Sequence, residues 1–140
     1  MKNSRYGLCF IALLMLLCAV GCGDKVKLGG KVTFSDDGSP LTAGTVIFST
    51  NTFEARGDIQ ADGTYKMSSD KAGDGLPPGK YKVYVCDAFK YERVGPANNP
   101  TDVSVALIHS MYSSPDTSGL EVDVSSSVKT FDFKVDRPKK

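Results

Sequence analysis

Short runs in which apolar and polar residues alternate, separated by turn-forming residues, constrain the fold of this chain most. In YKVYV (81–85) the first, third and fifth side chains would share one face of a strand. GLEVDV (119–124) and KTFDFKV (129–135) alternate in the same way. A period of two predicts half-buried strands, and no segment keeps a helical period of 3.6 over ten residues. The sequence therefore predicts an all-β fold.

Four earlier runs and their turns bring the expected number of strands to about seven. Those runs are VKLGGKVTF (26–34), GTVIFST (44–50), FEARGDIQ (53–60) and TYKMS (64–68). Asp37-Gly38 and Asp62-Gly63 are typical of tight turns. We expect the run at 53–60, which is the weakest of the four, at a sheet edge. Strands with one solvent-exposed face and one apolar face favour two sheets packed against each other, that is, a β-sandwich.

Residues 87–119 are the least informative part of the chain. DAFKYERVGPANNPTD (87–102) is polar and turn-rich, which favours a long connection that crosses between the sheets. VSVALIHSMY (103–112) is compatible with a strand that has one partly covered face. No internal repeat is evident.

The N-terminus carries an export signal. Lys2 and Arg5 precede a continuous apolar stretch, Leu8 to Val20, which is the pattern of a secretory signal peptide. The stretch is short for a membrane-spanning helix, which needs about 20 residues. A buried core helix is the alternative, but the stretch has no polar face.

The end of this segment resembles a bacterial lipobox. Ala19 and Val20 precede Gly21 and Cys22, and the resemblance implies cleavage between Gly21 and Cys22 and lipidation of Cys22. Two or more acyl chains anchor a protein stably. Ordinary secretion with cleavage nearby is the alternative. We therefore expect a signal peptide at 1–21, a lipidated tether at 22–27, a sandwich at 28–136 and a solvated tail at 137–140.

Removal of the signal peptide changes the charge and the cysteine count. Without Lys2 and Arg5 the formal charge falls from +1 to −1, so no large field would attract nucleic acid. Cys9 and Cys18 leave with the signal, and Cys22 carries lipid. Only Cys86 remains, so the mature chain cannot form an internal disulfide, and a buried, inert thiol is the simplest interpretation.

The segment that leads into residues 81–85 resembles the tyrosine corner of Greek-key sandwiches. Leu76, Pro78, Gly79 and Tyr81 stand in LPPGKY (76–81), and in such corners a tyrosine hydroxyl bonds to upstream backbone. Proline cannot donate to a ladder, so the strand must begin after Pro78. An ordinary Pro-Gly turn is the alternative.

Taken in order, the motifs resemble the carboxypeptidase regulatory-like domains, and in particular the small lipid-anchored versions of planctomycete-type bacteria. The motifs are GKVTF (30–34), GSPL (38–41), GTVIF (44–48), ADGTY (61–65), GLPPGKYKVYV (75–85), TSGL (117–120) and FDF (131–133). The resemblance covers about residues 28–136 and implies a seven-stranded Greek-key sandwich of transthyretin-like (prealbumin) type. It supplies no activity.

The residue inventory argues against an enzyme and against a metal or other cofactor. His109 is the single histidine, and zinc sites need three or four nitrogen or sulfur ligands. Ser110, Ser113 and Asp116 follow His109, but neighbours in sequence rarely have triad geometry. The Asp-Gly turns lack the converging oxygens of a calcium loop.

These observations predict a non-catalytic, lipid-anchored module of the bacterial cell envelope, exported by the general pathway and expected more at the outer than at the inner membrane. Its partners would be the membrane and an envelope protein or polysaccharide. A carbohydrate-binding module is the alternative function, since Tyr84, Tyr91 and Tyr112 would be exposed rings for stacking on sugars.

Overall fold

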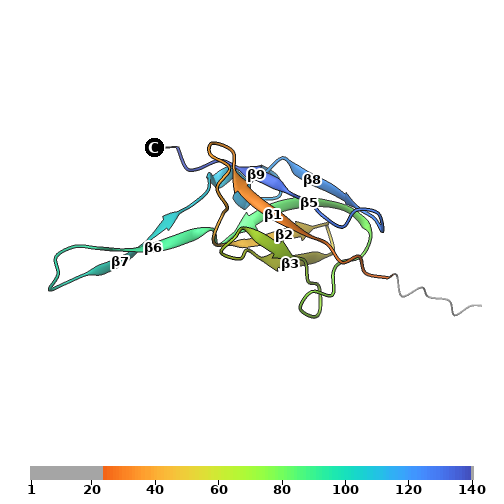
Figure 1. The fold of residues 1–140 in the computed structure, drawn as a ribbon, viewed down its shortest axis with the longest axis horizontal. Helices are drawn as coiled ribbons and strands as arrows, with labels where there is room; N and C mark the ends of the chain where they lie inside the picture. Colours follow the sequence, from red (N-terminus) through yellow and green to blue (C-terminus); the bar gives the residue numbers. More distant parts are fainter. Residues whose placement is uncertain (1–23, 140) are drawn as a thin grey trace, which may run out of the picture.

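A computed structural model describes residues 24–139, and the predicted signal peptide and lipobox lie outside them. Within this range the chain forms nine strands and one short 3-10 helix (Figure 1). The strands are β1 (Gly29–Phe34), β2 (Thr45–Ser49), β3 (Glu54–Asp58), β4 (Thr64–Lys66), β5 (Gly79–Cys86), β6 (Phe89–Val94), β7 (Thr101–Ala106), β8 (Leu120–Val124) and β9 (Phe133–Val135); the helix is η1 (Ser110–Ser113). No helix among the described residues is long and apolar enough to span a membrane.

Seven of the strands form two sheets, which confirms the predicted all-β sandwich. One sheet has the order β4-β1-β9 and the other β3-β2-β5-β8. β1 runs antiparallel to β4 and parallel to β9. The chain crosses between the sheets after β1, β3, β4 and β8, so strands distant in sequence become neighbours. β3, from the weak run at 53–60, lies at an edge as expected.

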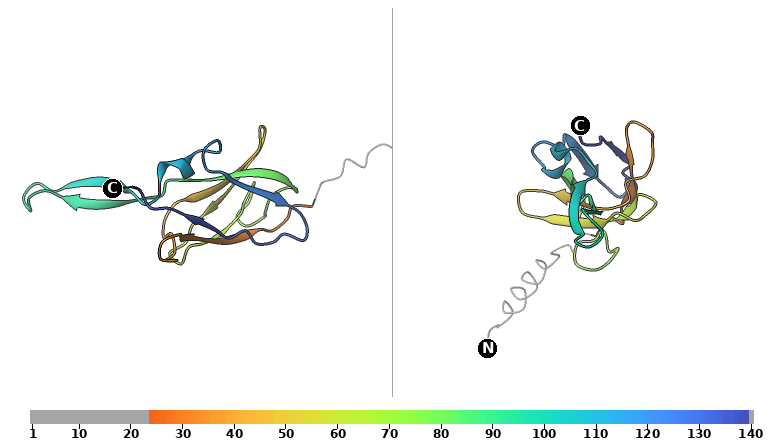
Figure 2. Two further views of the ribbon diagram at one scale, coloured as in Figure 1. Left: turned by 90° about the horizontal axis from the view of Figure 1, so that it is seen from above. Right: turned by 90° about the vertical axis from the view of Figure 1, so that its left-hand side faces the viewer.

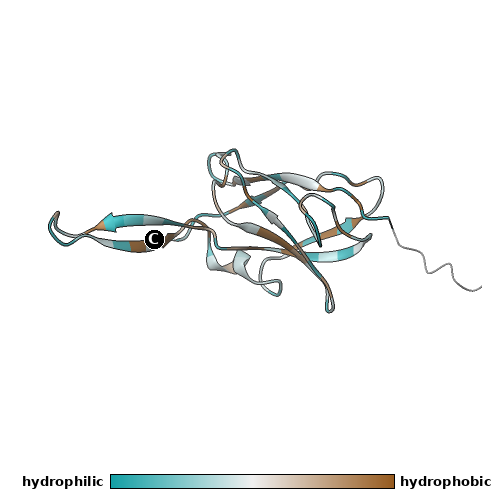
Figure 3. Cartoon of the chain, turned by 90° about the horizontal axis from the view of Figure 1, so that it is seen from below, coloured by the Kyte–Doolittle hydropathy of each residue, from teal (hydrophilic) through white to brown (hydrophobic). Residues whose placement is uncertain are grey.

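Alternation decides which side chains form the core. In β5, Tyr81, Val83 and Val85 are buried toward the other sheet, as the sequence predicts. Phe48 of β2 and Tyr65 of β4 face each other from opposite sheets with ring centroids 6.5 Å apart. Hydrophobic residues accordingly gather on the strands of the sandwich in Figure 3. Burial of apolar surface is the main stabilising term in a domain of this kind, and each Å² buried contributes about 25 cal/mol.

A buried tyrosine links the two edges of the smaller sheet. The hydroxyl of Tyr65 donates to the carbonyl of Phe131, with an O···O distance of 2.5 Å. Gly30 lies between them: a Cβ there would sit 2.0 Å from the Phe131 oxygen. The absence of a side chain at Gly30 therefore allows the segment before β9 and the hydroxyl of Tyr65 to approach β1 so closely.

The expectation of a long connection at 87–102 that crosses between the sheets is wrong, because β5 and β8 on either side of it belong to the same sheet. Those residues contribute β6 and the start of β7, which pair antiparallel over six residues from Phe89↔Ala106 to Val94↔Thr101. The expected strand at 103–112 is also wrong in extent, since β7 ends at Ala106 and η1 follows at 110–113. We call residues 89–106 the arm.

Residues on both sides of the expected sandwich, 28–136, also contact the fold. In the expected tether, Val26 is buried and pairs with Leu76, because its apolar side chain completes the core. In the expected solvated tail, Arg137 forms ion pairs with Asp36 and Asp37 at 3.0 Å and lies 3.7 Å above the ring of Phe34. The fold thus includes residues 25–27 and Arg137.

The molecule is elongated, with the arm at one end. In Figure 1 the arm extends to the left, while the first described residues lie at the right. The left-hand view of Figure 2 shows the same separation after a quarter turn. The arm and the N-terminal end of the fold therefore lie at opposite ends of the long axis.

Candidate interaction surfaces

The predicted tyrosine-corner residues come together at the start of β5. The hydroxyl of Tyr81 donates to the carbonyl of Pro77 at 2.8 Å, and burial raises the pKa of this tyrosine. Gly79 has a φ of 153°, and a Cβ there would be 3.7 Å from the Tyr81 ring. Leu76 is fully buried. This arrangement stabilises the loop and presents no polar group to a ligand.

The structure does not bring Tyr84, Tyr91 and Tyr112 together as a stacking platform. Tyr112 is only 9% exposed and its hydroxyl donates to Asp136, so the expectation that it is exposed is wrong. Tyr84 is half-buried on the outer face of the larger sheet and donates to Glu54 at 3.0 Å. Burial and this bond raise the pKa of Tyr84 to about 12. Tyr91 alone is well exposed, at 71%.

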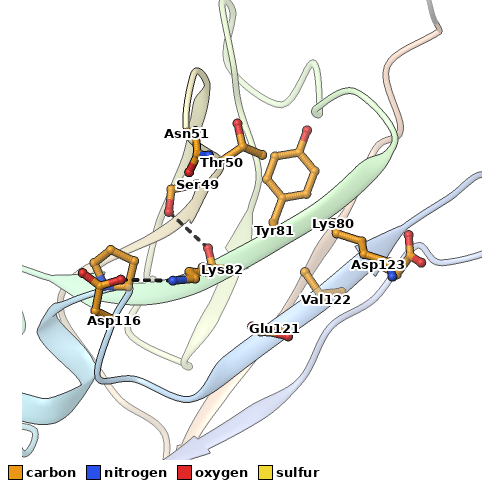
Figure 4. Close-up of a pocket in the computed structure, with 11 residues that line it drawn as sticks. Ser49, Thr50, Asn51, Lys80, Tyr81, Lys82, Asp116, Glu121, Val122 and Asp123 are labelled. Carbon is orange, nitrogen blue, oxygen red and sulfur yellow. Dashed lines mark hydrogen bonds and ion pairs between the residues drawn. The ribbon is translucent and has the colours of Figure 1, made fainter.

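A groove of about 670 Å³ lies on the outer face of β5 and β8 (Figure 4). Its charged residues are set by the strand register, which places Lys80 opposite Asp123 and Lys82 opposite Glu121. Lys82 also forms an ion pair with Asp116 at 3.0 Å. Opposite charges therefore compensate one another across the groove.

This groove can bind polar groups but has no evident catalytic apparatus. It contains hydroxyls from Ser49 and Thr50, yet its residues include no histidine to activate them. Ser49 Oγ lies 3.5 Å from the carbonyl of Lys82, at the limit of a hydrogen bond. Exposed ion pairs such as Lys82–Asp116 contribute between 0 and about 1 kcal/mol. The groove is best described as the solvated face of the sheet.

The contacts of His109 and Cys86 indicate structural roles for both side chains. The Nδ1 atom of His109 accepts from the backbone N–H of Met111 at 3.2 Å, so this side chain caps η1. Cys86 ends β5 as a half-buried thiol, and burial raises its pKa, which lowers its reactivity. Among residues 24–139 no group of three potential metal-ligating side chains occurs.

The carboxylates of Asp37 and Asp74, which each precede a glycine, accept hydrogen bonds from neighbouring groups of the chain. Asp37 accepts from the N–H of Ser39 at 2.9 Å and from its hydroxyl at 2.6 Å. These bonds and the Arg137 guanidinium lower the pKa of Asp37 to about 2. Asp74 accepts from Lys25 at 2.7 Å and from the N–H of Ser69 at 2.8 Å, which holds its pKa well below the usual range.

The arm is the most exposed regular structure in the described part of the chain. Tyr91, Val94 and Val103 are 71%, 44% and 36% exposed. Lys90 and Glu92 form an ion pair at 2.5 Å along β6, and Arg93 reaches Asp102 across the hairpin at 3.0 Å. Figure 1 shows that the arm projects beyond both sheets. Sequence analysis missed it because charges interrupt the apolar pattern of FKYERV.

Comparisons with known proteins identify no family for the chain. No protein-family model matches, and no curated protein matches. The major pilin subunit BcpA of Bacillus cereus is similar in structure, with a TM-score of 0.45 and 15% identity over 82% of this chain and 30% of that chain. A 9R-lipoxygenase from Cyanothece PCC8801 has a TM-score of 0.35 and 15% identity over 79% of this chain and 16% of that chain. The chain spans less than a third of either protein, and neither likeness indicates a function.

Proposed function

We propose that the protein is a lipid-anchored component of the bacterial cell envelope whose β-sandwich is a non-catalytic binding module of the carboxypeptidase regulatory-like type. The observation that carries this proposal is the tetrapeptide Ala19 to Cys22, which follows the apolar stretch of the signal and has the order of a lipobox. The strand order β4-β1-β9 and β3-β2-β5-β8 supports the transthyretin-like part of the proposal.

The start of the folded module fits an anchor at Cys22. Lys25 forms ion pairs with Asp70 and Asp74, and Val26 is part of the core. Only Gly23 and Asp24 then separate the proposed lipid attachment from the fold. Because residues extend at most about 3.6 Å each, this end of the sandwich stays close to the membrane. The arm lies at the other end of the long axis, far from the proposed anchor (Figure 1).

A binding role is supported by what the surface presents. The large groove on β5 and β8 has paired charges, and His109 is engaged as a helix cap. The arm, in contrast, presents backbone edges and exposed apolar side chains. Carbohydrate binding has the weaker support, because Tyr91 alone of the three tyrosines is well exposed. We therefore favour a protein partner in the envelope.

Metabolic labelling with a palmitate analogue, followed by membrane fractionation, tests the anchor. The full-length protein should be labelled and should sediment with membranes. Cys22→Ala should lose the label and retain residues 1–21, because processing depends on the lipidated cysteine. The retained apolar stretch can itself hold this variant at the membrane, so the label and the cleavage, not sedimentation, decide the test. Cys86→Ala is the matched control and should behave like the unaltered protein. Labelling that persists in Cys22→Ala would refute the proposal.

A further inference from the structure

The arm has two free edges. β6 and β7 pair with each other and with no other strand of the described chain. A two-stranded hairpin is marginally stable in water by itself, whereas three or more strands can be independently stable. Unpaired edges also offer rows of N–H and C=O groups to another strand. The arm is thus built to gain stability from an added strand.

The hydrogen-bond phase of the hairpin shows which groups of β6 face outward. The N–H of Leu107 donates to the carbonyl of Ala88 at 2.9 Å, which makes Ala88 and Leu107 a hydrogen-bonded pair. Bonded and non-bonded pairs alternate along an antiparallel ladder. The pair Tyr91↔Ser104 is therefore non-bonded, as are its neighbours two residues away. The backbone groups of Tyr91 and Arg93 consequently point away from β7, toward the free edge.

This phase and the charges of β6 together select one register for self-pairing. An added antiparallel copy of β6 must place its own odd-numbered residues opposite Phe89, Tyr91 and Arg93. Centred on Tyr91, this arrangement sets Lys90 of each copy opposite Glu92 of the other. A shift by two residues in either direction sets Lys90 against Lys90, or Glu92 against Glu92. Like charges directly opposite each other are destabilising, and opposite charges are stabilising.

We propose that the arm is a homodimerisation element, in which β6 pairs antiparallel with β6 of a second copy about a two-fold axis at Tyr91. Each Tyr91 N–H would donate to the carbonyl of the other Tyr91, and each Arg93 N–H to the carbonyl of the opposite Phe89. Arg93 would also lie beside the ring of Phe89, a favourable cation–π arrangement. The two hairpins then form one four-stranded sheet with an isologous interface.

The edge formed by β7 lacks this selectivity. Its outward residues are Asp102, Ser104 and Ala106, from the same alternation. Registers centred on Val103 and on Ser104 both avoid opposing like charges. A strand whose registers are not distinguished by charge or burial is weakly specified. The observations therefore favour β6 as the interface.

Charge exchange tests the register directly. In Glu92→Lys and in Lys90→Glu, two attractive contacts of the dimer become two repulsive ones, so the dissociation constant should rise about tenfold or more. Each variant should fail to pair with itself, but a mixture of the two restores Lys opposite Glu on both sides. The mixture and the doubly exchanged protein should both dimerise like the unaltered chain. Sedimentation velocity of the full-length protein in detergent measures these equilibria.

Cysteine cross-linking tests the two-fold axis in cells. Opposing residues of a hydrogen-bonded pair have Cα atoms about 5.5 Å apart, which suits a disulfide. In a Cys86→Ser background, Tyr91→Cys should give more covalent dimer under mild oxidation than the Cys86→Ser parent, which also contains Cys22 and so corrects for any cross-link formed there. Ser104→Cys, on the other edge, is the matched control and should not.

Three results would overturn the proposal: no association of the unaltered chain at any accessible concentration, no recovery in the mixture of charge variants, or cross-linking at Ser104 in place of Tyr91. The measurements use the protein from whichever fraction contains it. Their outcome is therefore independent of whether Cys22 is lipidated, and a failed anchor would not be mistaken for a failed dimer.

Discussion

The hydroxyl of Tyr65 offers a sharp test of how the smaller sheet is held together. Tyr65→Phe removes one oxygen and leaves the ring in contact with Phe48 and Phe133, whose centroids lie 6.5 and 6.2 Å away. The carbonyl of Phe131 then loses the donor 2.5 Å from it. Because Tyr65 is 2% exposed, water cannot reach this carbonyl from the side of the ring.

The expected cost follows from the loss of this buried bond. Leaving a buried acceptor unsatisfied costs about 1–3 kcal/mol. For residues 24–139 an unfolding entropy of about 2.1 cal/mol/K per residue gives about 0.24 kcal/mol/K, so the melting temperature should fall by about 4–12 °C. Calorimetry of the two proteins measures this shift. Chemical denaturation should show a lower midpoint with an unchanged slope.

Tyr91→Phe is the matched control, because it removes the same atom from an exposed side chain and should leave the melting temperature within about 1–2 °C.

The burial of the Tyr65 hydroxyl also predicts how stability changes at high pH. Burial raises the pKa of Tyr65 above its usual value of 10, so unfolding releases a proton above pH 10 and stability falls as the pH rises. Equal melting temperatures for Tyr65→Phe and the unaltered protein would refute this account of the sheet.

Gly30→Ala should destabilise the fold by at least about 2 kcal/mol, because the new Cβ would lie 2.0 Å from the backbone oxygen of Phe131. Gly38→Asn, at an open position with a φ of 71° that asparagine accepts, should change the denaturation midpoint little. Asp37→Asn should flatten the loss of stability in acid: the pKa of Asp37 is lowered to about 2, so its contribution is present above its usual pKa of 3.8 and is lost as the pH falls toward 2. Urea midpoints measured between pH 6 and pH 2 report this difference, and identical pH profiles for the two proteins would contradict it.

The sandwich could be predicted from sequence because its signals are local. Alternation in YKVYV places Tyr81, Val83 and Val85 in the core. The preceding Pro-Pro-Gly fixes where β5 starts, and the hydroxyl of Tyr81 bonds to Pro77. Each of these features depends on residues within a few positions of one another.

The arm and the ends of the fold could not be predicted in the same way. In β6, Lys90 and Glu92 form an ion pair, and both faces of the strand are largely exposed. Its sequence therefore does not show the alternation of apolar and polar residues that indicates a half-buried strand. The contacts of Arg137 with Asp36 and Asp37 join residues about a hundred positions apart. The buried Tyr112 donates to Asp136, which lies 24 positions further along the chain. Such pairings follow from tertiary structure, and no local pattern indicates them.

The arm and the N-terminal end of the fold lie at opposite ends of the long axis, which has a consequence for the shape of the proposed dimer (Figures 1 and 2). Antiparallel joining through β6 directs the two sandwiches outward, so both N-terminal ends, and the lipids proposed for them, would lie at the extremities of one rod. A rod of this kind cannot stand upright on a single bilayer with both lipids inserted. It either lies along one bilayer or acts as a spacer, whose length would then fix the gap between two facing membranes.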